Sequence, residues 1–293
     1  MSKKKVLLTG ALGQLGRAIQ RVYKDEVEFI KTDVVEAEGV SVLDITDADA
    51  VEKIVSDNQI DVIINCAAFT NVDGCETQED LAYNINANGP KNLAVSAKNN
   101  NAKLIHVSTD YVFAGDGDRP YVETDEPAPV SAYGRTKLAG EQFVQSCSDK
   151  YFILRTAWLY GEGHNFVKTM LKLSENHDEV SVVMDQLGTP TSAMELARMI
   201  YALEATELYG IYHATCEGDT NWAAFAEAIF KKAGKSTKVN YVTSAQYKEM
   251  NPKSANRPAY SILVNAALKE KLPSFSMAMW EDALDEYMKE YIL

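Results

Sequence analysis

The stretch Val6-Leu7-Leu8-Thr9-Gly10-Ala11-Leu12-Gly13-Gln14-Leu15-Gly16 decides the fold of this 293-residue chain. Its three large hydrophobes predict a buried strand, and the pattern from Leu15 to Tyr23 predicts a helix directly after it. In the turn between them, Gly10 allows a sharp reversal, Gly13 lets a pyrophosphate approach the backbone, and Gly16 lets the helix pack against the strand. Unpaired N–H groups at the helix N-terminus attract phosphate charge. The turn therefore predicts a dinucleotide-binding unit.

Short apolar runs alternate with helical patterns through the first half of the chain, as is typical of a parallel sheet covered by helices. We expect further strands at 28–33, 62–65, 104–107 and 152–155, and helices at 51–58, 81–99 and 132–145. Beyond residue 161 we expect helices at 166–174, 192–205 and 222–232, a loop at 185–191, and a strand at 210–213 that returns to the sheet. These patterns predict an α/β fold with a smaller, interleaved C-terminal lobe.

Composition narrows the class of protein. The chain is 46% hydrophobic and 24% charged, as in an ordinary globular protein. Its 29 basic and 42 acidic residues give a net charge of −13, which argues against a nucleic-acid partner. Cys66, Cys75, Cys147 and Cys216 are scattered without metal-type pairing. No apolar run is long enough for a signal peptide or a membrane span, so we expect a cytoplasmic protein without a membrane partner.

Tyr133 and Lys137 lie four residues apart on a predicted helix and therefore share one face. A tyrosine becomes a useful acid at neutral pH only if a nearby cation stabilises its phenolate, and the lysine ammonium can do so. Thr109 follows the strand that begins near Leu104, at the sheet edge where ligands of such folds bind. An exposed structural pair is the alternative, but the glycine turn and Thr109 favour a catalytic one.

Asp33 ends the predicted second strand, near the spacing at which an acid binds the adenosine ribose. An acid there favours NADH over NADPH, because it repels a 2′-phosphate. The alternative is a solvated aspartate at a strand end.

The Thr9–Gly16 turn, the Asn65–Ala68 segment, the Ser108–Phe113 run and the Tyr133/Lys137 pair resemble the extended short-chain dehydrogenase/reductases. Within that family the chain is similar to the dTDP-4-dehydrorhamnose reductase branch, from the first strand to the final helix, in the runs Phe69–Asp73, Tyr133–Glu141, Arg155–Gly161, Asn165-Phe166, Asp185–Thr191 and Arg257-Pro258. The resemblance implies a Rossmann-type doubly wound parallel sheet with a substrate-binding lobe. The nucleotide-binding domain is then expected over 1–160, rejoined by about 192–215, and the lobe over 161–191 and 216–293.

The resemblance also implies an activity: NAD(P)H-dependent reduction of the C4 keto group of dTDP-4-dehydro-β-L-rhamnose to dTDP-β-L-rhamnose, a precursor of cell-surface polysaccharide. By matching position, Tyr133 would protonate the C4 oxygen, Thr109 would orient the carbonyl, and Lys137 would hold the nicotinamide ribose and lower the proton affinity of the phenol. NADPH or NADH is expected to contact Gly10, Gly13, Gln14, Leu15, Gly16, Asp33, Asp44, Ile45, Ala67, Ala68, Tyr133 and Lys137. The dTDP-sugar is expected to contact Thr70, Val72, Asn86, Asp110, Tyr111, Trp158, Asn165 and Arg257, the last two at its diphosphate.

Some relatives dimerise through a metal held by surface glutamates. No such cluster is identified in this sequence, so we assign no metal ligand, and both the need for a metal ion and the choice between monomer and homodimer stay open. Two other functions also stay open: a 4-ketoreductase for another dTDP-deoxysugar, with small changes around Val72 and Trp158, and a non-catalytic nucleotide-binding regulatory subunit. The intact Thr109, Tyr133 and Lys137 argue against the latter, because a purely structural module has no physical need for all three.

Overall fold

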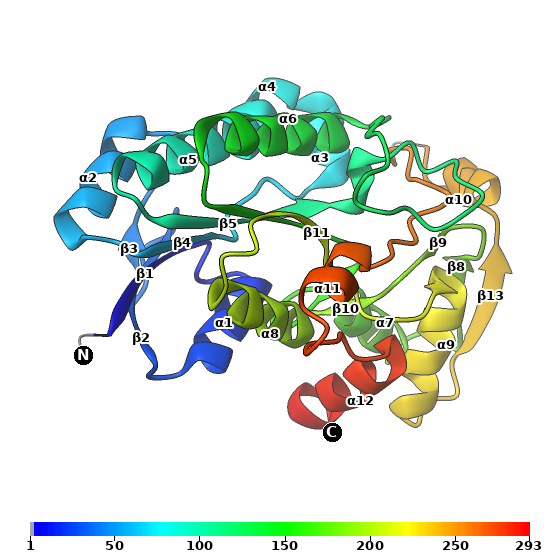
Figure 1. The fold of residues 1–293 in the computed structure, drawn as a ribbon. Helices are drawn as coiled ribbons and strands as arrows, with labels where there is room; N and C mark the ends of the chain where they lie inside the picture. Colours follow the sequence, from blue (N-terminus) through cyan, green and yellow to red (C-terminus); the bar gives the residue numbers. More distant parts are fainter. Residues whose placement is uncertain (1–2, 253) are drawn as a thin grey trace.

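A seven-stranded parallel sheet lies between two layers of helices in the computed structural model, which describes residues 3–252 and 254–293 (Figure 1). The strand order is β11-β6-β5-β4-β1-β2-β3. The bounds are β1 Lys4–Thr9, β2 Val27–Asp33, β3 Ser41–Val42, β4 Val62–Asn65, β5 Lys103–Thr109, β6 Tyr151–Thr156 and β11 Gly210–His213. Because the order reverses between β1 and β4, a crevice forms at their carboxyl ends. The predicted doubly wound sheet is confirmed.

Alternating side chains of the strands reach the two helical layers. In β1, Val6 and Leu8 pack in one apolar core with helices on the first face, whereas Leu7 packs in a second core on the other face. The first layer contains α1 (Gln14–Tyr23) and α8 (Ala193–Glu204), and the second contains α2 (Ala48–Asn58), α5 (Gly89–Asn99) and α6 (Ala132–Cys147). Both faces of the sheet are therefore covered, which explains the continuous apolar runs of its strands.

The single helix expected at 81–99 is instead two helices joined by a π-helical turn. α4 (Glu79–Tyr83) is followed by the turn at Asn84–Asn88 and then by α5. The Gly89 N–H donates to the carbonyl of Asn84, five residues back, and Pro90 has no N–H to donate to the carbonyl of Asn86. The buried Asn86 side chain of this turn bonds to Phe69 and Thr136.

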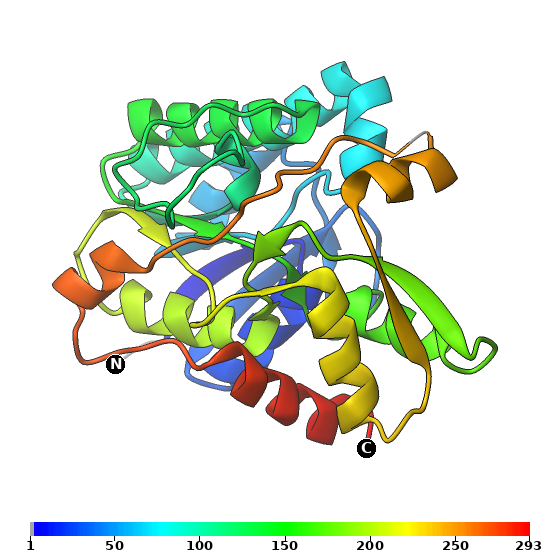
Figure 2. The same cartoon turned by 90° about the vertical axis from the view of Figure 1, so that its right-hand side faces the viewer.

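The C-terminal part of the chain builds a second apolar core around three helices, α7 (Phe166–Leu173), α9 (Trp222–Lys232) and α12 (Trp280–Tyr291) (Figure 2). Two strands not expected from the sequence, β8 (Glu179–Val183) and β13 (Lys238–Val242), pair in parallel beside α9. The expected loop at 185–191 contains β9 (Leu187–Gly188) and the start of β10 (Thr191–Ser192). Each pairs with a distant two-residue strand, β12 (Thr220–Asn221) and β7 (Leu159–Tyr160), so local sequence could not reveal them.

Three short helices complete the chain: α3 (Val72–Thr77), α10 (Ser244–Met250) and α11 (Ala266–Lys271). β11 pairs with β6 after the chain has left the sheet, and α8 packs against α1. Within residues 3–252 and 254–293, no helix is long and apolar enough to cross a membrane.

Candidate active site

The glycine turn after β1 has the close contacts that its spacing predicts. Gly10 has a φ of +64°, and a Cβ there would lie 2.8 Å from the backbone nitrogen of Ala67. A Cβ on Gly16 would lie 2.3 Å from the carbonyl oxygen of Gly10. A Cβ on Gly13 would meet only that same oxygen, at 3.3 Å. Gly10 and Gly16 are therefore needed for packing, while Gly13 faces more open space.

The N-terminus of α1 suits a bound pyrophosphate. Its N-cap, Gly13, provides no side-chain hydrogen bond, and its first turn holds no acidic residue. The helix therefore presents N–H groups and the positive end of its dipole without an internal anion. Gln14, the first residue of the helix, has a buried side-chain oxygen without a partner among the described residues. These features fit the phosphates of a dinucleotide, with Gln14, Leu15 and Gly16 around them.

The predicted adenosine end of the cofactor site is divided between exposed and core residues. One carboxylate oxygen of Asp33 accepts a hydrogen bond from the Leu12 N–H of the glycine turn at 3.1 Å. Asp44 is exposed, and its side chain accepts hydrogen bonds from Thr46. Ile45 is buried in the core beside α5. Asp33 thus stabilises the turn, and its position at the end of β2 still suits a ribose contact.

Thr109, Tyr133 and Lys137 come together at the carboxyl end of β5, where α6 lies against the strand. Lys137 is 2% exposed and donates from Nζ to the Val107 carbonyl oxygen at 2.7 Å. The Thr109 hydroxyl lies close enough to Tyr133 to lower the pKa of the phenol, although burial raises that pKa more strongly. The three predicted catalytic side chains therefore form one cluster.

A glycine of α6 makes this close packing possible. A Cβ on Gly134 would lie 2.1 Å from the carbonyl oxygen of Tyr111, so only a glycine lets the helix approach the end of β5 so closely. The neighbouring Tyr133 ring then meets the Tyr111 ring edge-on, with 5.4 Å between the centroids. Gly134 thereby lets α6 bring Tyr133 against Tyr111.

Lys137 lies in an environment that makes its charge costly. Burial lowers the pKa of its ammonium to about 8, and the nearby Glu141 offsets part of that effect. Glu141 lies one turn further along α6, fully buried, where it pairs with Arg155 of β6 at 2.8 Å and accepts a hydrogen bond from Ser108 at 2.5 Å. Sequence reasoning missed this buried pair, because a Glu and an Arg on separate elements carry no local signal.

Asp110 and Tyr111 form a 3₁₀ turn with Val112 directly after Thr109. The Asp110 side chain is 3% exposed and accepts a hydrogen bond from the Thr109 hydroxyl at 2.9 Å. Burial raises the pKa of its carboxyl to about 6. The predicted sugar-contacting residues Asp110 and Tyr111 therefore lie beside the catalytic cluster.

Asn86 holds the loop that follows β4. Its side-chain oxygen accepts from the Phe69 N–H at 2.8 Å, and its amide nitrogen donates to the Phe69 carbonyl at 3.1 Å and to the Thr136 hydroxyl at 3.2 Å. These bonds occupy the amide, so the structure places Asn86 behind the loop that bears Ala67, Ala68 and Thr70. Ala67 and Ala68 are half-buried along the crevice, and Thr70 is exposed at its rim with the half-buried Val72.

Trp158 lies on an aromatic stack at the other side of the crevice. It has a φ of +50°, and its ring stacks on that of Trp222 with 3.7 Å between centroids and 13° between planes. A Cβ on Gly188 would lie 2.6 Å from the Trp158 ring. Trp222 is half-buried, packs against the second apolar core and supports Trp158.

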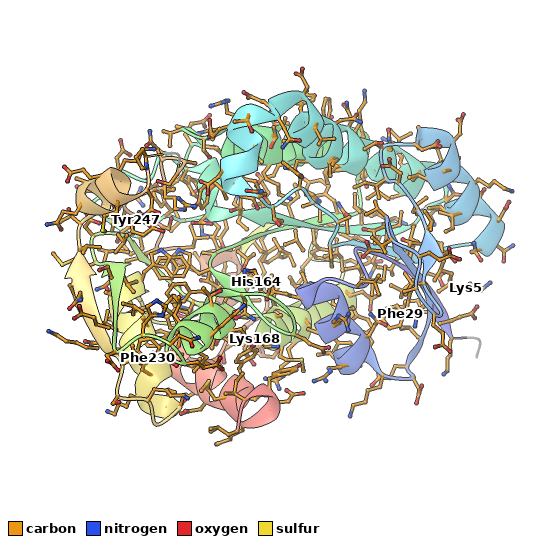
Figure 3. The ribbon with its side chains drawn as sticks, turned by 180° about the vertical axis from the view of Figure 1, so that it is seen from behind. Lys5, Phe29, His164, Lys168, Phe230 and Tyr247 are labelled. Atoms are coloured by element: carbon orange, nitrogen blue, oxygen red, sulfur yellow. The ribbon has the colours of Figure 1, made fainter. Side chains whose placement is uncertain are left out.

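Arg257 lines a cavity of about 560 Å³ between α3 and α10, together with Asp73, Tyr247, Met250, Asn251, Pro252 and Ser254. In Figure 3, Tyr247 lies at one end of the molecule and Lys5, at the start of β1, at the other. The guanidinium pairs with Asp73 at 3.3 Å. Arg257 therefore faces an open space that an anionic group can enter.

Asn165, the second residue predicted at the diphosphate, caps α7. Its oxygen accepts from the Lys168 N–H at 3.0 Å, and its amide donates to the Gly161 carbonyl and to the Tyr287 hydroxyl. The side chain is buried and its hydrogen-bonding groups are used internally. Asn165 therefore shapes the loop above α1.

No group of three or more His, Cys, Asp or Glu side chains that could hold a metal ion lies within the described part of the chain.

Comparison with known proteins identifies the family. The family model described as RmlD substrate binding domain matches residues 4–293. A solved dTDP-4-dehydrorhamnose reductase from Clostridium acetobutylicum is 49% identical, with a TM-score of 0.91 over 97% of this chain and 98% of that one. The Bacillus anthracis enzyme of that name, solved in complex with NADP, is 41% identical, with a TM-score of 0.91 over 98% and 99% of the two chains.

Among curated proteins, the spore coat polysaccharide biosynthesis protein SpsK of Bacillus subtilis is 39% identical over 98% of this chain and 97% of its own length. The chain belongs to the RmlD substrate binding domain family, because the family model matches almost the whole sequence and the similar proteins cover nearly all of it.

Proposed function

We propose that this protein is an NAD(P)H-dependent reductase that converts dTDP-4-dehydro-β-L-rhamnose to dTDP-β-L-rhamnose. The observation that carries the proposal is the placement of Lys137 and Tyr133 on α6 against the end of β5. The buried Lys137 ammonium bonds to the Val107 carbonyl, and the Tyr133 phenol lies close to Thr109. The glycine turn lies at the same edge of the sheet, at the end of β1. The similar proteins named dTDP-4-dehydrorhamnose reductase support the choice of substrate.

The side chains divide the work of a carbonyl reduction. The bound nicotinamide supplies the hydride that C4 of the sugar receives. Tyr133 gives its hydroxyl proton to the C4 oxygen, which would otherwise carry the negative charge. Lys137 stabilises the resulting phenolate by its positive charge, which acts over a short distance in a site with little water. Thr109 directs its hydroxyl at the carbonyl oxygen and holds it in position for proton transfer.

The remaining predicted contacts surround this centre. We place the cofactor phosphates at Gly13–Gly16 and its adenosine near Asp33 and Asp44. We place the deoxysugar between Tyr111 and Trp158, where an aromatic face can cover apolar C–H groups of the ring. Arg257 would exchange Asp73 for the diphosphate, since its fork of donors suits phosphate oxygens.

Substitution of Tyr133 by Phe tests this assignment. Tyr133→Phe keeps the ring that packs against Tyr111 but removes the proton donor, so we expect kcat to fall by about 10²–10⁴-fold with cofactor affinity retained. The measurement is oxidation of NADPH and NADH, followed by absorbance, with enzymatically generated dTDP-4-dehydro-L-rhamnose and identification of the sugar product. Near-normal turnover by the variant would refute the role of Tyr133. Cofactor binding without turnover by the unmodified protein would redirect the search to other dTDP-4-keto sugars.

We further propose that the two lobes follow the division expected from the sequence and that the protein works in the cytoplasm as a monomer or homodimer. All four cysteines are free thiols, which agrees with a reducing compartment.

A further inference from the structure

The Thr109 hydroxyl donates its single proton to Asp110, so that proton is not free for a substrate carbonyl. In the structure, Oγ1 of Thr109 donates to Oδ1 of Asp110 at 2.9 Å, and the N–H of Tyr111 reaches the same Oγ1 at 3.3 Å. A hydroxyl has one proton to donate and two lone pairs that accept. While Asp110 is a carboxylate, it can only accept, so it retains the Thr109 proton and leaves none for a substrate carbonyl.

The surroundings of Asp110 favour its neutral form. The side chain is 3% exposed, and Oδ2 has no hydrogen-bond partner with normal geometry among the described residues. The titratable groups that face it are the phenols of Tyr133 on α6 and Tyr111 on its own turn, whose pKa values its charge would raise. Buried Ser261 lies close enough to offset part of the pKa rise. The nearby guanidinium of Arg257 lowers the pKa of Tyr111, and it is paired with Asp73.

We propose that Asp110 is a positioning residue whose protonated form turns the Thr109 hydroxyl toward the carbonyl oxygen of the substrate. When neutral, the Asp110 carboxyl donates its own proton to Oγ1 of Thr109, and the Thr109 proton is free for the sugar. Asp110 takes up one proton from solvent, the Thr109–Asp110 hydrogen bond reverses its direction, and the freed Thr109 proton forms a new hydrogen bond to the substrate. This inference rests on the proposed function and adds a pH limit to it.

The proposal predicts two separate losses of activity as the pH rises. The first accompanies ionisation of Asp110, whose pKa lies near 6, and turns Thr109 away from the substrate. The second accompanies deprotonation of Lys137, whose pKa lies near 8, and removes the charge that stabilises the phenolate. The diphosphate of the substrate is ionised throughout this range, so it contributes to neither loss.

The experiment measures kcat and kcat/KM between about pH 5 and pH 9 for the full-length protein and for Asp110→Asn. The asparagine amide donates to Oγ1 of Thr109 as the neutral acid does, but it cannot ionise. We expect the pH profile of Asp110→Asn to lack the first loss and to retain the second, whatever the absolute rate of the variant. Asp110→Ala, which has no donor, should be slower at every pH. Asp118→Asn, the same change on an exposed residue, should retain both losses.

If Asp110→Asn shows the first loss of activity at the same pH as the unmodified enzyme, the proposal is overturned. Thermal melting and cofactor binding establish whether each variant folds. If Asp110→Asn does not fold, Ser261→Ala provides the test. Removing the Ser261 hydroxyl raises the pKa of Asp110 further, so the first loss of activity should move to higher pH. A first loss at the same pH as in the unmodified enzyme would overturn the proposal. Absence of turnover by the unmodified protein at every pH, with cofactor bound, is a different result and refutes the proposed function.

Discussion

Removal of Glu141 should destabilise the protein strongly, because it leaves a buried arginine without its counter-ion. The Glu141 carboxylate receives three hydrogen bonds from the Arg155 guanidinium, at 2.8, 3.0 and 3.2 Å. The exposed fractions of the two side chains are 0% for Glu141 and 2% for Arg155. Breaking such a pair from one side costs about 3–5 kcal/mol of unfolding free energy. Because a domain is stable by only about 5–15 kcal/mol, Glu141→Leu should lower the denaturant midpoint markedly.

The double variant Glu141→Leu/Arg155→Met tests whether the lost stability comes from the ion pair itself. Replacing both partners by apolar residues of similar volume is often neutral, since neither charge is then left in the core. We therefore expect the double variant to recover most of the stability that Glu141→Leu loses. Guanidinium unfolding curves of both single variants, the double variant and the unmodified protein complete the cycle. A loss below about 1 kcal/mol in Glu141→Leu, or a double variant no more stable than the single ones, would refute the reasoning.

Two further variants test other parts of the site. Gly134→Ala places a Cβ 2.1 Å from the Tyr111 carbonyl oxygen, so α6 must shift. We expect kcat to fall by about 10²-fold, because misplacement of a reacting group by about 1 Å has that effect. Steady-state rates within about twofold of normal would contradict the packing argument. Asp33→Ala should narrow any preference for NADH over NADPH if the carboxylate contacts the ribose, whereas an unchanged ratio of kcat/KM values would assign Asp33 to the turn alone.

The sequence predicted the parts of the molecule that local patterns determine. The β1–turn–α1 unit could be read directly, because strand, glycines and helix are contiguous. The spacing of Tyr133 and Lys137 predicted that both lie on one helix, and both do lie on α6. Thr109 followed from its position at a strand end, where parallel sheets gather their ligands.

Features that depend on distant partners could not be read in this way. The π-helical turn at 84–88 lies within a continuous helical pattern, and its Asn86 bonds to the distant Phe69. The predicted roles of Asn86 and Asn165 came from matching positions, and only the coordinates show their amides bonded to the protein itself. Trp222 has helical spacing, which gives no sign of its stacking against Trp158. The direction of the Thr109 hydroxyl likewise depends on its bond to Asp110.

The late return of the chain to the main sheet has a consequence for engineering. β11 and α8 belong by packing to the nucleotide-binding half, yet both come after β8 in the sequence. A chimera of two relatives joined once near residue 160 would therefore take β11 and α8 from one parent. The rest of the nucleotide-binding half would come from the other parent. A chimera meant to exchange the C-terminal lobe needs two grafted segments, one before α8 and one after β11, with the recipient's own 192–215 kept between them.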